Sequence, residues 1–100
     1  MKRQKITKAN IVENIYGSSE LQKRDILRVV DELFEELKSA LKNDMVIELR
    51  GFGTFEVRTR KGRPRARNPK TGELTPVDTH GVAVFRPGKE IKSLVWMLRK

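Results

Sequence analysis

Apolar residues in the first part of the chain recur at the spacing of an α-helix. In residues 6–17, Ile11 and Ile15 lie one helical turn apart, and Thr7 suits the N-cap of a short helix. Residues 25–44 carry a longer apolar face, made of Ile26, Leu27, Val29, Val30, Leu33, Phe34, Leu37, Ala40 and Leu41. The pattern therefore predicts two helices. The face of the second is too broad for one short helix to cover.

The link between these helices leaves the start of the second one open. Ser19 and Gln22 have the spacing of a capping box, and a start two or three residues further along is the alternative.

After residue 44 the pattern changes to the alternation of β-strands. Apolar and polar positions alternate through residues 45–50 and again from Phe55 to Arg60, on either side of the glycine-containing turn at 50–53. Residues 81–88 indicate a short buried strand, and residues 88–100 a terminal helix. The predicted fold class is α+β, with helices and a small antiparallel sheet.

A basic segment without large apolar side chains interrupts the strand pattern. Residues 67–73, RNPKTGE, have the turn chemistry of a hairpin loop built on a type I turn. Residues 73–77 can then return antiparallel to 59–66. Because the stretch from about 58 to 80 has too few apolar residues to bury a core, we predict an arm that projects from the body.

The net charge of the chain indicates the kind of partner that it binds. The 100 residues include 22 Lys and Arg against 13 Asp and Glu, a net charge of +9. An anionic partner is favoured, and nucleic acid or an anionic membrane surface are the usual two. The apolar runs are too short to span a bilayer, and we expect no membrane partner. Disulfides and cysteine-based sites are excluded because the chain has no cysteine.

The arm holds most of the excess charge. Its basic residues are Arg58, Arg60, Lys61, Arg63, Arg65, Arg67 and Lys70. Such cations can neutralise phosphates and release counterions, which drives binding to nucleic acid regardless of sequence. The alternative interpretation of the same residues is a solvated charge run or a localisation signal.

Three separated motifs resemble one family. GFGTFEVR (51–58), RNPKTG (67–72) and FRPGK (85–89) are similar in order and approximate spacing to those of the bacterial HU/IHF family of DNA-bending proteins. TKANIVENIY (7–16) is similar to that family's first helix, so the resemblance covers nearly the whole chain. One departure is an interval from Val57 to Asn68 that is one residue longer than in the commonest members.

The resemblance implies a single domain over residues 1–100 that forms an intertwined homodimer or heterodimer. Residues 1–44 would form the helical dimerisation part, 45–87 a β-sheet saddle extended into the β-ribbon arm, and 88–100 the terminal helix. The resemblance also implies binding in the minor groove of DNA with an inserted apolar wedge, as HU and IHF bind. The matching wedge in this chain is Pro69, flanked by Arg67 and Asn68. The implied location is cytoplasmic and nucleoid-associated.

Four basic residues outside the arm are further candidates for binding DNA phosphates. Arg86, Lys89 and Lys92 lie at or near the start of the last helix, and Lys8 lies at the start of the first. For Lys92 a solvated lysine is an equally good interpretation.

Two other classes of protein remain as alternatives. A basic RNA-binding protein of the ribosomal type would share the charge, but it gives no reason for a proline-tipped arm. A nucleic-acid enzyme is disfavoured because no carboxylate cluster lies beside the arm and His80 is the only histidine. Gly51 and Gly53 lack the following Gly-Lys-Ser/Thr of a phosphate loop. We expect no cofactor, metal or small-molecule substrate.

Overall fold

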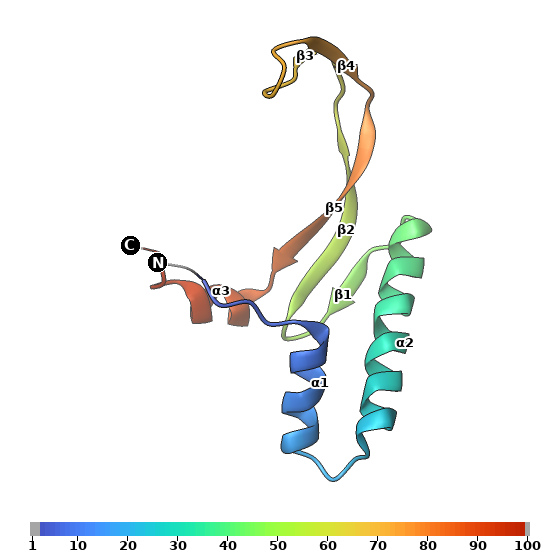
Figure 1. Ribbon diagram of the computed structural model, residues 1–100, viewed down its shortest axis with the longest axis vertical. Helices are drawn as coiled ribbons and strands as arrows, with labels where there is room; N and C mark the ends of the chain where they lie inside the picture. The colour runs from blue at the N-terminus through green and yellow to red at the C-terminus, as the bar shows by residue number, and fades with distance from the viewer. Residues whose placement is uncertain (1–2, 100) are drawn as a thin grey trace. The chain divides into compact units, whose positions relative to one another are not determined.

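The computed structural model describes residues 3–99 of the chain (Figure 1). The elements in chain order are α1 (Lys8–Gly17), α2 (Lys23–Lys42), β1 (Ile47–Leu49), β2 (Gly53–Arg60), β3 (Arg63–Arg67), β4 (Leu74–Val77), β5 (His80–Pro87) and α3 (Lys89–Val95). By internal contacts the chain divides into two compact units, and the boundary between Ser39 and Ala40 falls near the end of α2. Helices and antiparallel strands together confirm the predicted α+β class.

Helix α1 begins where the sequence pattern predicts. Thr7 is its N-cap, and a reciprocal capping box joins Thr7 to Asn10. The Thr7 hydroxyl accepts from the Asn10 amide at 3.2 Å, and the Asn10 side-chain oxygen accepts from the Thr7 amide at 3.0 Å. These two bonds satisfy amide groups that the helix itself leaves unpaired.

Helix α2 begins at Lys23. Of the two predicted starts, the one two or three residues after the Ser19–Gln22 capping box is therefore correct, and the capping box itself is wrong. The Ser19 hydroxyl instead accepts from the Leu21 amide at 3.3 Å. The backbone oxygen of Gln22 accepts from the amides of Asp25 and Ile26 at 3.0 and 3.1 Å, so Gln22 itself stands at the start of the helix.

The apolar face of α2 is only partly buried. Val12, Ile26 and Val30 are the buried apolar residues among those the structure describes. Other side chains of the predicted face, such as Val29 and Leu33, are about half or more exposed, at 64% and 49%. The chain alone therefore leaves much apolar helix surface in water, as expected if a second subunit is to cover it.

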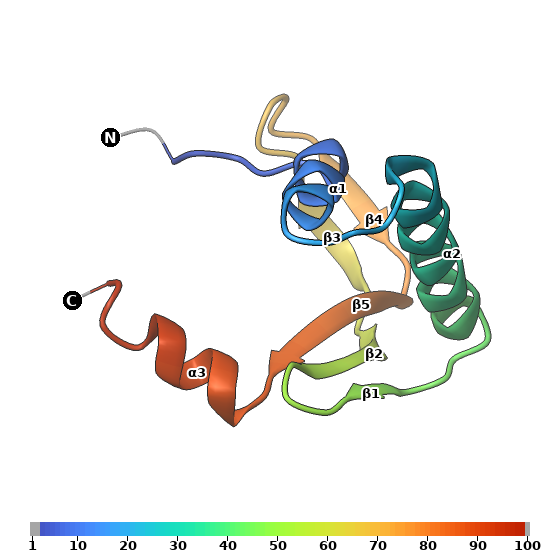
Figure 2. The same ribbon diagram turned by 90° about the horizontal axis from the view of Figure 1, so that it is seen from below.

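Three strands form the antiparallel sheet of the second unit, in the order β1-β2-β5 (Figure 2). Phe55 in β2 lies between Ile47 of β1 and Phe85 of β5. The rings of Phe52, Phe55 and Phe85 form a cluster with centroids 4.8 to 6.4 Å apart. The aromatic residues thus pack against one another on the sheet rather than on the arm.

Several predicted boundaries shift by a few residues. Strand β1 is shorter than the predicted 45–50, and β5 begins one residue before the predicted 81. Helix α3 ends at Val95, not at 100, because Trp96 and Leu98 donate to carbonyls only three residues back, in the pattern of turns.

The arm is a two-stranded ribbon built in two parts (Figure 1). In the first part β2 pairs with β5 as far as Arg60 opposite His80. In the second, β3 pairs with β4 from Arg63 opposite Val77 to Arg67 opposite Leu74. The predicted pairing of 59–66 with 73–77 is therefore correct from Arg63 onward, but wrong for residues 59 and 60, which pair with β5.

A tight joint separates the two parts of the ribbon at Gly62. Its amide donates to the hydroxyl of Thr79 at 3.0 Å. A Cβ atom at this position would lie 2.3 Å from the Val77 carbonyl oxygen and 2.6 Å from the Thr79 nitrogen. Because such distances are too short for any side chain, the close approach of the opposite backbone requires glycine here.

A β-bulge lies beyond this joint. Three residue steps lead from Arg63 to Ala66 in β3, whereas two steps lead from Val77 to Thr75 in β4. One extra residue of β3 is thus accommodated opposite Pro76, where Pro64 and Pro76 have no amide hydrogen to give to the ladder. This bulge lies within the Val57–Asn68 interval.

Candidate nucleic-acid interface

The predicted arm cations all lie on the ribbon or at its tip. Arg58 and Arg60 are in β2, Lys61 follows β2, and Arg63, Arg65 and Arg67 are in β3. Lys70 is in the tip loop. All seven are exposed to solvent. The ribbon brings them onto one narrow projection of the second unit, where phosphates could approach from more than one side.

These cations differ in their internal partners. Within the described chain, Arg60, Lys61, Arg63, Arg65, Arg67 and Lys70 form no ion pair with a carboxylate, whereas Arg58 forms one with Glu56. The charge of the outer arm is therefore not cancelled by the chain itself. An external anion is the partner that these side chains lack.

Glu56 links the arm to the body of the sheet. Its Oε2 accepts from Arg86 Nε at 2.6 Å and lies 3.4 Å from Arg58 Nη2. The Glu56 side chain is 18% exposed, less than any other ion-paired carboxylate of the described residues. Two arginines from neighbouring strands are thus held together on one face of the sheet.

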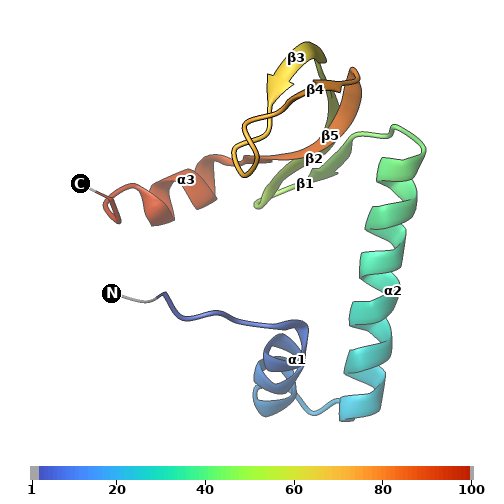
Figure 3. The same cartoon turned by 45° about the horizontal axis from the view of Figure 1, so that its top comes forward.

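The tip is an ordered turn (Figure 3). The Asn68 side-chain oxygen accepts from the Lys70 amide at 2.9 Å, and its backbone oxygen accepts from the Gly72 amide at 2.7 Å. Gly72 has φ +76°, a left-handed conformation that glycine adopts without strain. The Asn68 amide donates to the Glu73 oxygen at 2.7 Å and closes the loop. Pro69 is held, exposed, at the end of the ribbon.

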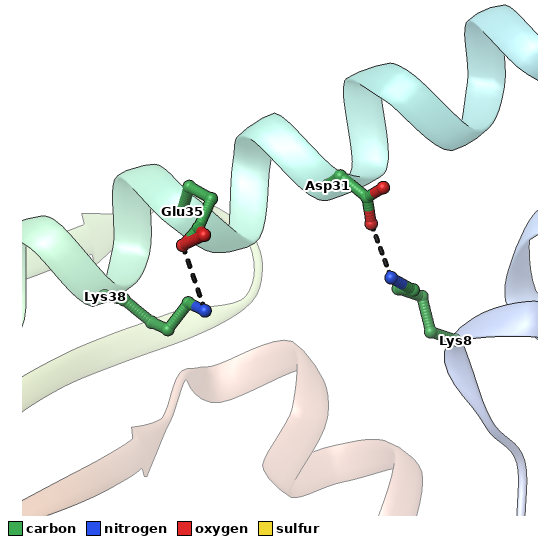
Figure 4. Close-up of polar contacts among 4 residues, drawn as sticks. All are labelled: Lys8, Asp31, Glu35 and Lys38. Carbon is green, nitrogen blue, oxygen red and sulfur yellow. Dashed lines mark hydrogen bonds and ion pairs between the residues drawn. The ribbon is translucent and has the colours of Figure 1, made fainter.

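The body candidates fall in the two separate units. Arg86 is in β5, and Lys89 and Lys92 are in α3, whose N-cap Gly88 has no side-chain capping bond. Lys8, the first residue of α1, lies in the other unit and pairs with Asp31 of α2 at 2.5 Å (Figure 4). Lys8 therefore has an internal carboxylate partner, whereas Lys89 and Lys92 have none among the described residues.

Comparison with known proteins settles the class of the molecule. A family model described as bacterial DNA-binding protein matches residues 6–95. The chain belongs to this family, the HU/IHF family. It is accordingly an architectural protein that binds and bends double-stranded DNA and dimerises with a copy of itself or a related subunit.

Similar sequences and structures lie on both branches of the HU/IHF family. The alpha subunits of integration host factor from Vibrio parahaemolyticus and Pseudoalteromonas translucida are 41% and 43% identical. These matches cover 95% and 90% of this chain, and 96% and 90% of the relatives. A cocrystal structure of Anabaena HU with DNA has a TM-score of 0.81 and 30% identity, covering 90% of this chain and 97% of that one. Thermotoga maritima HU, at 24% identity and a TM-score of 0.66, shares the fold; that match covers 90% of this chain and 99% of the other.

Some residues that build the interface are not singled out by the sequence. Glu56 belongs to a family-like motif, but its bonds to arginines of two strands require the sheet register. Gly62 and Pro64 carry a detectable signal, since glycine and proline inside a strand pattern mark bulges and close backbone approaches. The basic residues on either side of Gly62 and Pro64 give a stronger signal, which is one of charge.

His80, the only histidine in the sequence, is the first residue of β5. Its Nδ1 lies 2.7 Å from the backbone oxygen of Asp78. Residues 3–99 contain no group of His, Asp and Glu side chains arranged to hold a metal ion. No helix in the same range is long and apolar enough to cross a membrane.

Proposed function

We propose that the arm, residues 58–80, enters the minor groove of DNA and that Pro69 wedges between base pairs at its tip. The observation that supports this is the combination of uncancelled arginines along the ribbon with a rigid proline fixed at the exposed end. Opening a base step costs a few kcal/mol, and the additional interactions of the wrapped duplex offset that cost. Arg67 and Asn68, on the N-terminal side of the wedge, would meet base edges or sugars in the groove.

The roles of the other basic residues follow from their places. Arg58, Arg60, Lys61, Arg63, Arg65 and Lys70 would bind phosphates along the arm, while Lys8, Arg86, Lys89 and Lys92 would bind phosphates of the DNA that passes over the body. In the dimer we expect residues 1–44 to form the main subunit interface. Such a protein would work in the cytoplasm, associated with the nucleoid, without a cofactor and without enzymatic activity.

A competition between nucleic acids tests this function. We expect the protein to bind kinked or nicked duplex DNA more tightly than double-stranded RNA of the same length, at matched salt concentration, since a wedge gains most from steps that are already open. A clear preference for the RNA would contradict the proposal and support a ribosomal type of RNA binding.

Footprinting on genomic fragments with excess competitor DNA separates the two modes within the family. Discrete protected sites would mean IHF-like site preference, and uniform protection would mean HU-like general binding.

A further inference from the structure

The bulge in β3 determines which face of the ribbon carries the arginines near the tip. Residues that face each other across two strands point to the same side of a sheet, and successive residues alternate between the sides. Arg58 and Arg86 bind the same Glu56 carboxylate, so all three lie on one face. Arg60, two residues beyond Arg58, belongs to this face too. We call it the Arg58 face.

The count of residues carries this assignment along the ribbon. Between the pair Arg60–His80 and the pair Arg63–Val77, both strands advance by three residues. Two residues on each side form the joint and belong to no strand, and the assignment takes the alternation to continue through them because the two connections are equally long. On this count Arg63 falls on the opposite face. From Val77 to Leu74, strand β4 again advances by three residues. Arg67, which pairs with Leu74, is therefore back on the Arg58 face.

A regular ladder would give the opposite result. Without the bulge, Arg67 would lie four residues from Arg63 on an unbroken alternation and would share its face. Arg65 would lie there as well. With the bulge, Pro64 and Arg65 both lie opposite Pro76. Pro76 is on the Arg58 face by the alternation of β4, and Arg65 therefore lies on that face as well.

The bulge is required by two residue pairs whose positions on the ribbon are fixed. At the joint, Arg63 pairs with Val77. At the tip, the turn requires Asn68 to pair with Glu73, as the 2.7 Å bond shows. Five residue steps lead from Arg63 to Asn68, whereas four lead from Val77 to Glu73. The one extra residue must be accommodated between these pairs.

We propose that this bulge aligns the arginines of the tip with those of the base, so that Arg58, Arg60, Arg65 and Arg67 present one continuous cationic face to DNA. The inference rests on the proposed role of the arm. The tip turn follows Arg67 directly. The register that determines the face of Arg67 therefore also determines the orientation of the loop that contains Pro69.

Two variants without a bulge provide a matched test. Deletion of Pro64 makes both strands equally long between the fixed pairs, and Arg67 still pairs with Leu74 on the Arg58 face. Insertion of one threonine between Thr75 and Pro76 also makes the two strands equally long. Four residue steps then separate Arg63 from Arg67 in β3 and their partners in β4, so Arg67 moves to the face of Arg63, opposite to the Arg58 face. Neither change alters the net charge.

We expect the deletion variant to keep the DNA bend angle and the salt dependence of affinity close to those of the unaltered protein. In the insertion variant the bend angle should fall, and the slope of log K against log salt should flatten by about 0.9 for each phosphate that is no longer neutralised. Backbone NOEs between Arg67 and Leu74 would verify the register in each protein. Light scattering would verify that each remains a dimer.

Equal bending by the deletion and insertion variants would overturn the inference, as would NOEs placing Arg67 opposite Glu73 in the unaltered protein. Failure of the proposed function would look different. In that case Pro69→Ala would bend DNA as the unaltered protein does, and replacing Arg65 and Arg67 by alanine would leave the salt slope unchanged.

Discussion

Most basic residues of the first two helices differ from those of the outer arm in having a carboxylate partner. On α1 and α2, four basic side chains have carboxylate partners, in the pairs Lys8–Asp31, Lys23–Glu13, Arg28–Glu32 and Lys38–Glu35. Figure 4 shows the first and the last of these pairs. On the arm from Arg60 to the tip, the described residues form no such pair. The same residue types thus serve two purposes in one chain of 100 residues.

The contrast teaches that the location of positive charge matters more here than its total amount. Exposed ion pairs contribute at most about 1 kcal/mol each to stability, but they cancel the local field. Uncancelled cations on a projecting ribbon keep their field and attract a polyanion from a distance set by the Debye length, about 10 Å at 0.1 M salt.

Removal of arm arginines should have the largest effect on DNA binding. Replacing Arg65 and Arg67 together by alanine should flatten the slope of log K against log salt by about 0.9 for each phosphate that these side chains neutralise. Fluorescence titration of labelled duplex at several salt concentrations measures this slope.

The matched control removes the same charge from the helices. Arg28→Ala with Lys38→Ala should change the slope by much less, because both side chains already have carboxylate partners. Equal changes in the two double variants would remove the distinction between arm and helices.

A smaller effect is expected from the joint. Gly62→Ala forces the strands apart, since the added Cβ would lie 2.3 Å from the Val77 oxygen. The outer arm should lose its direction, and DNA affinity should fall several-fold at unchanged net charge. Gly17→Ala, where nothing lies within 4 Å of the added atom, is the control for a glycine change elsewhere. Unaltered binding by Gly62→Ala would show that the joint does not position the arm.

Releasing the arginines held by Glu56 should act in the opposite direction. Glu56→Gln keeps the shape of the side chain, removes one negative charge and leaves Arg58 and Arg86 without their shared carboxylate. Affinity for duplex DNA should rise a few-fold. Glu48→Gln changes the charge equally on the paired strand β1. If both variants bind alike, the effect belongs to net charge and not to the release of these arginines.

The smallest effect concerns the stability of the helices. The Lys38–Glu35 pair is largely exposed, with side chains 71% and 69% accessible. Lys38→Gln should therefore lower the free energy of unfolding by no more than about 0.5 kcal/mol. Urea denaturation followed by circular dichroism measures it, and a decrease of several kcal/mol would mean that the pair has a structural role.

Local sequence signals predict most of the fold and the position of the arm. Helical periodicity identifies α1 and α2, alternation identifies β2, and Asn68 with Pro69 and Gly72 identifies the tip turn, because each of these depends on residues close in sequence. The bulge, the joint at Gly62 and the sharing of Glu56 by two arginines depend on residue counts and packing across strands. Gly62 and Pro64 signal an irregularity in the strand, but no local pattern gives the pairing across strands that defines these features.

The most direct test of the central claim is the bend angle of a DNA duplex labelled at both ends, measured by energy transfer at saturating protein. Pro69→Ala should bend the duplex less than the unaltered protein while losing little affinity, because the arm arginines remain. Pro76→Ala, which changes a proline of the same arm away from the tip, should bend it normally. An unchanged bend angle for Pro69→Ala would contradict the account.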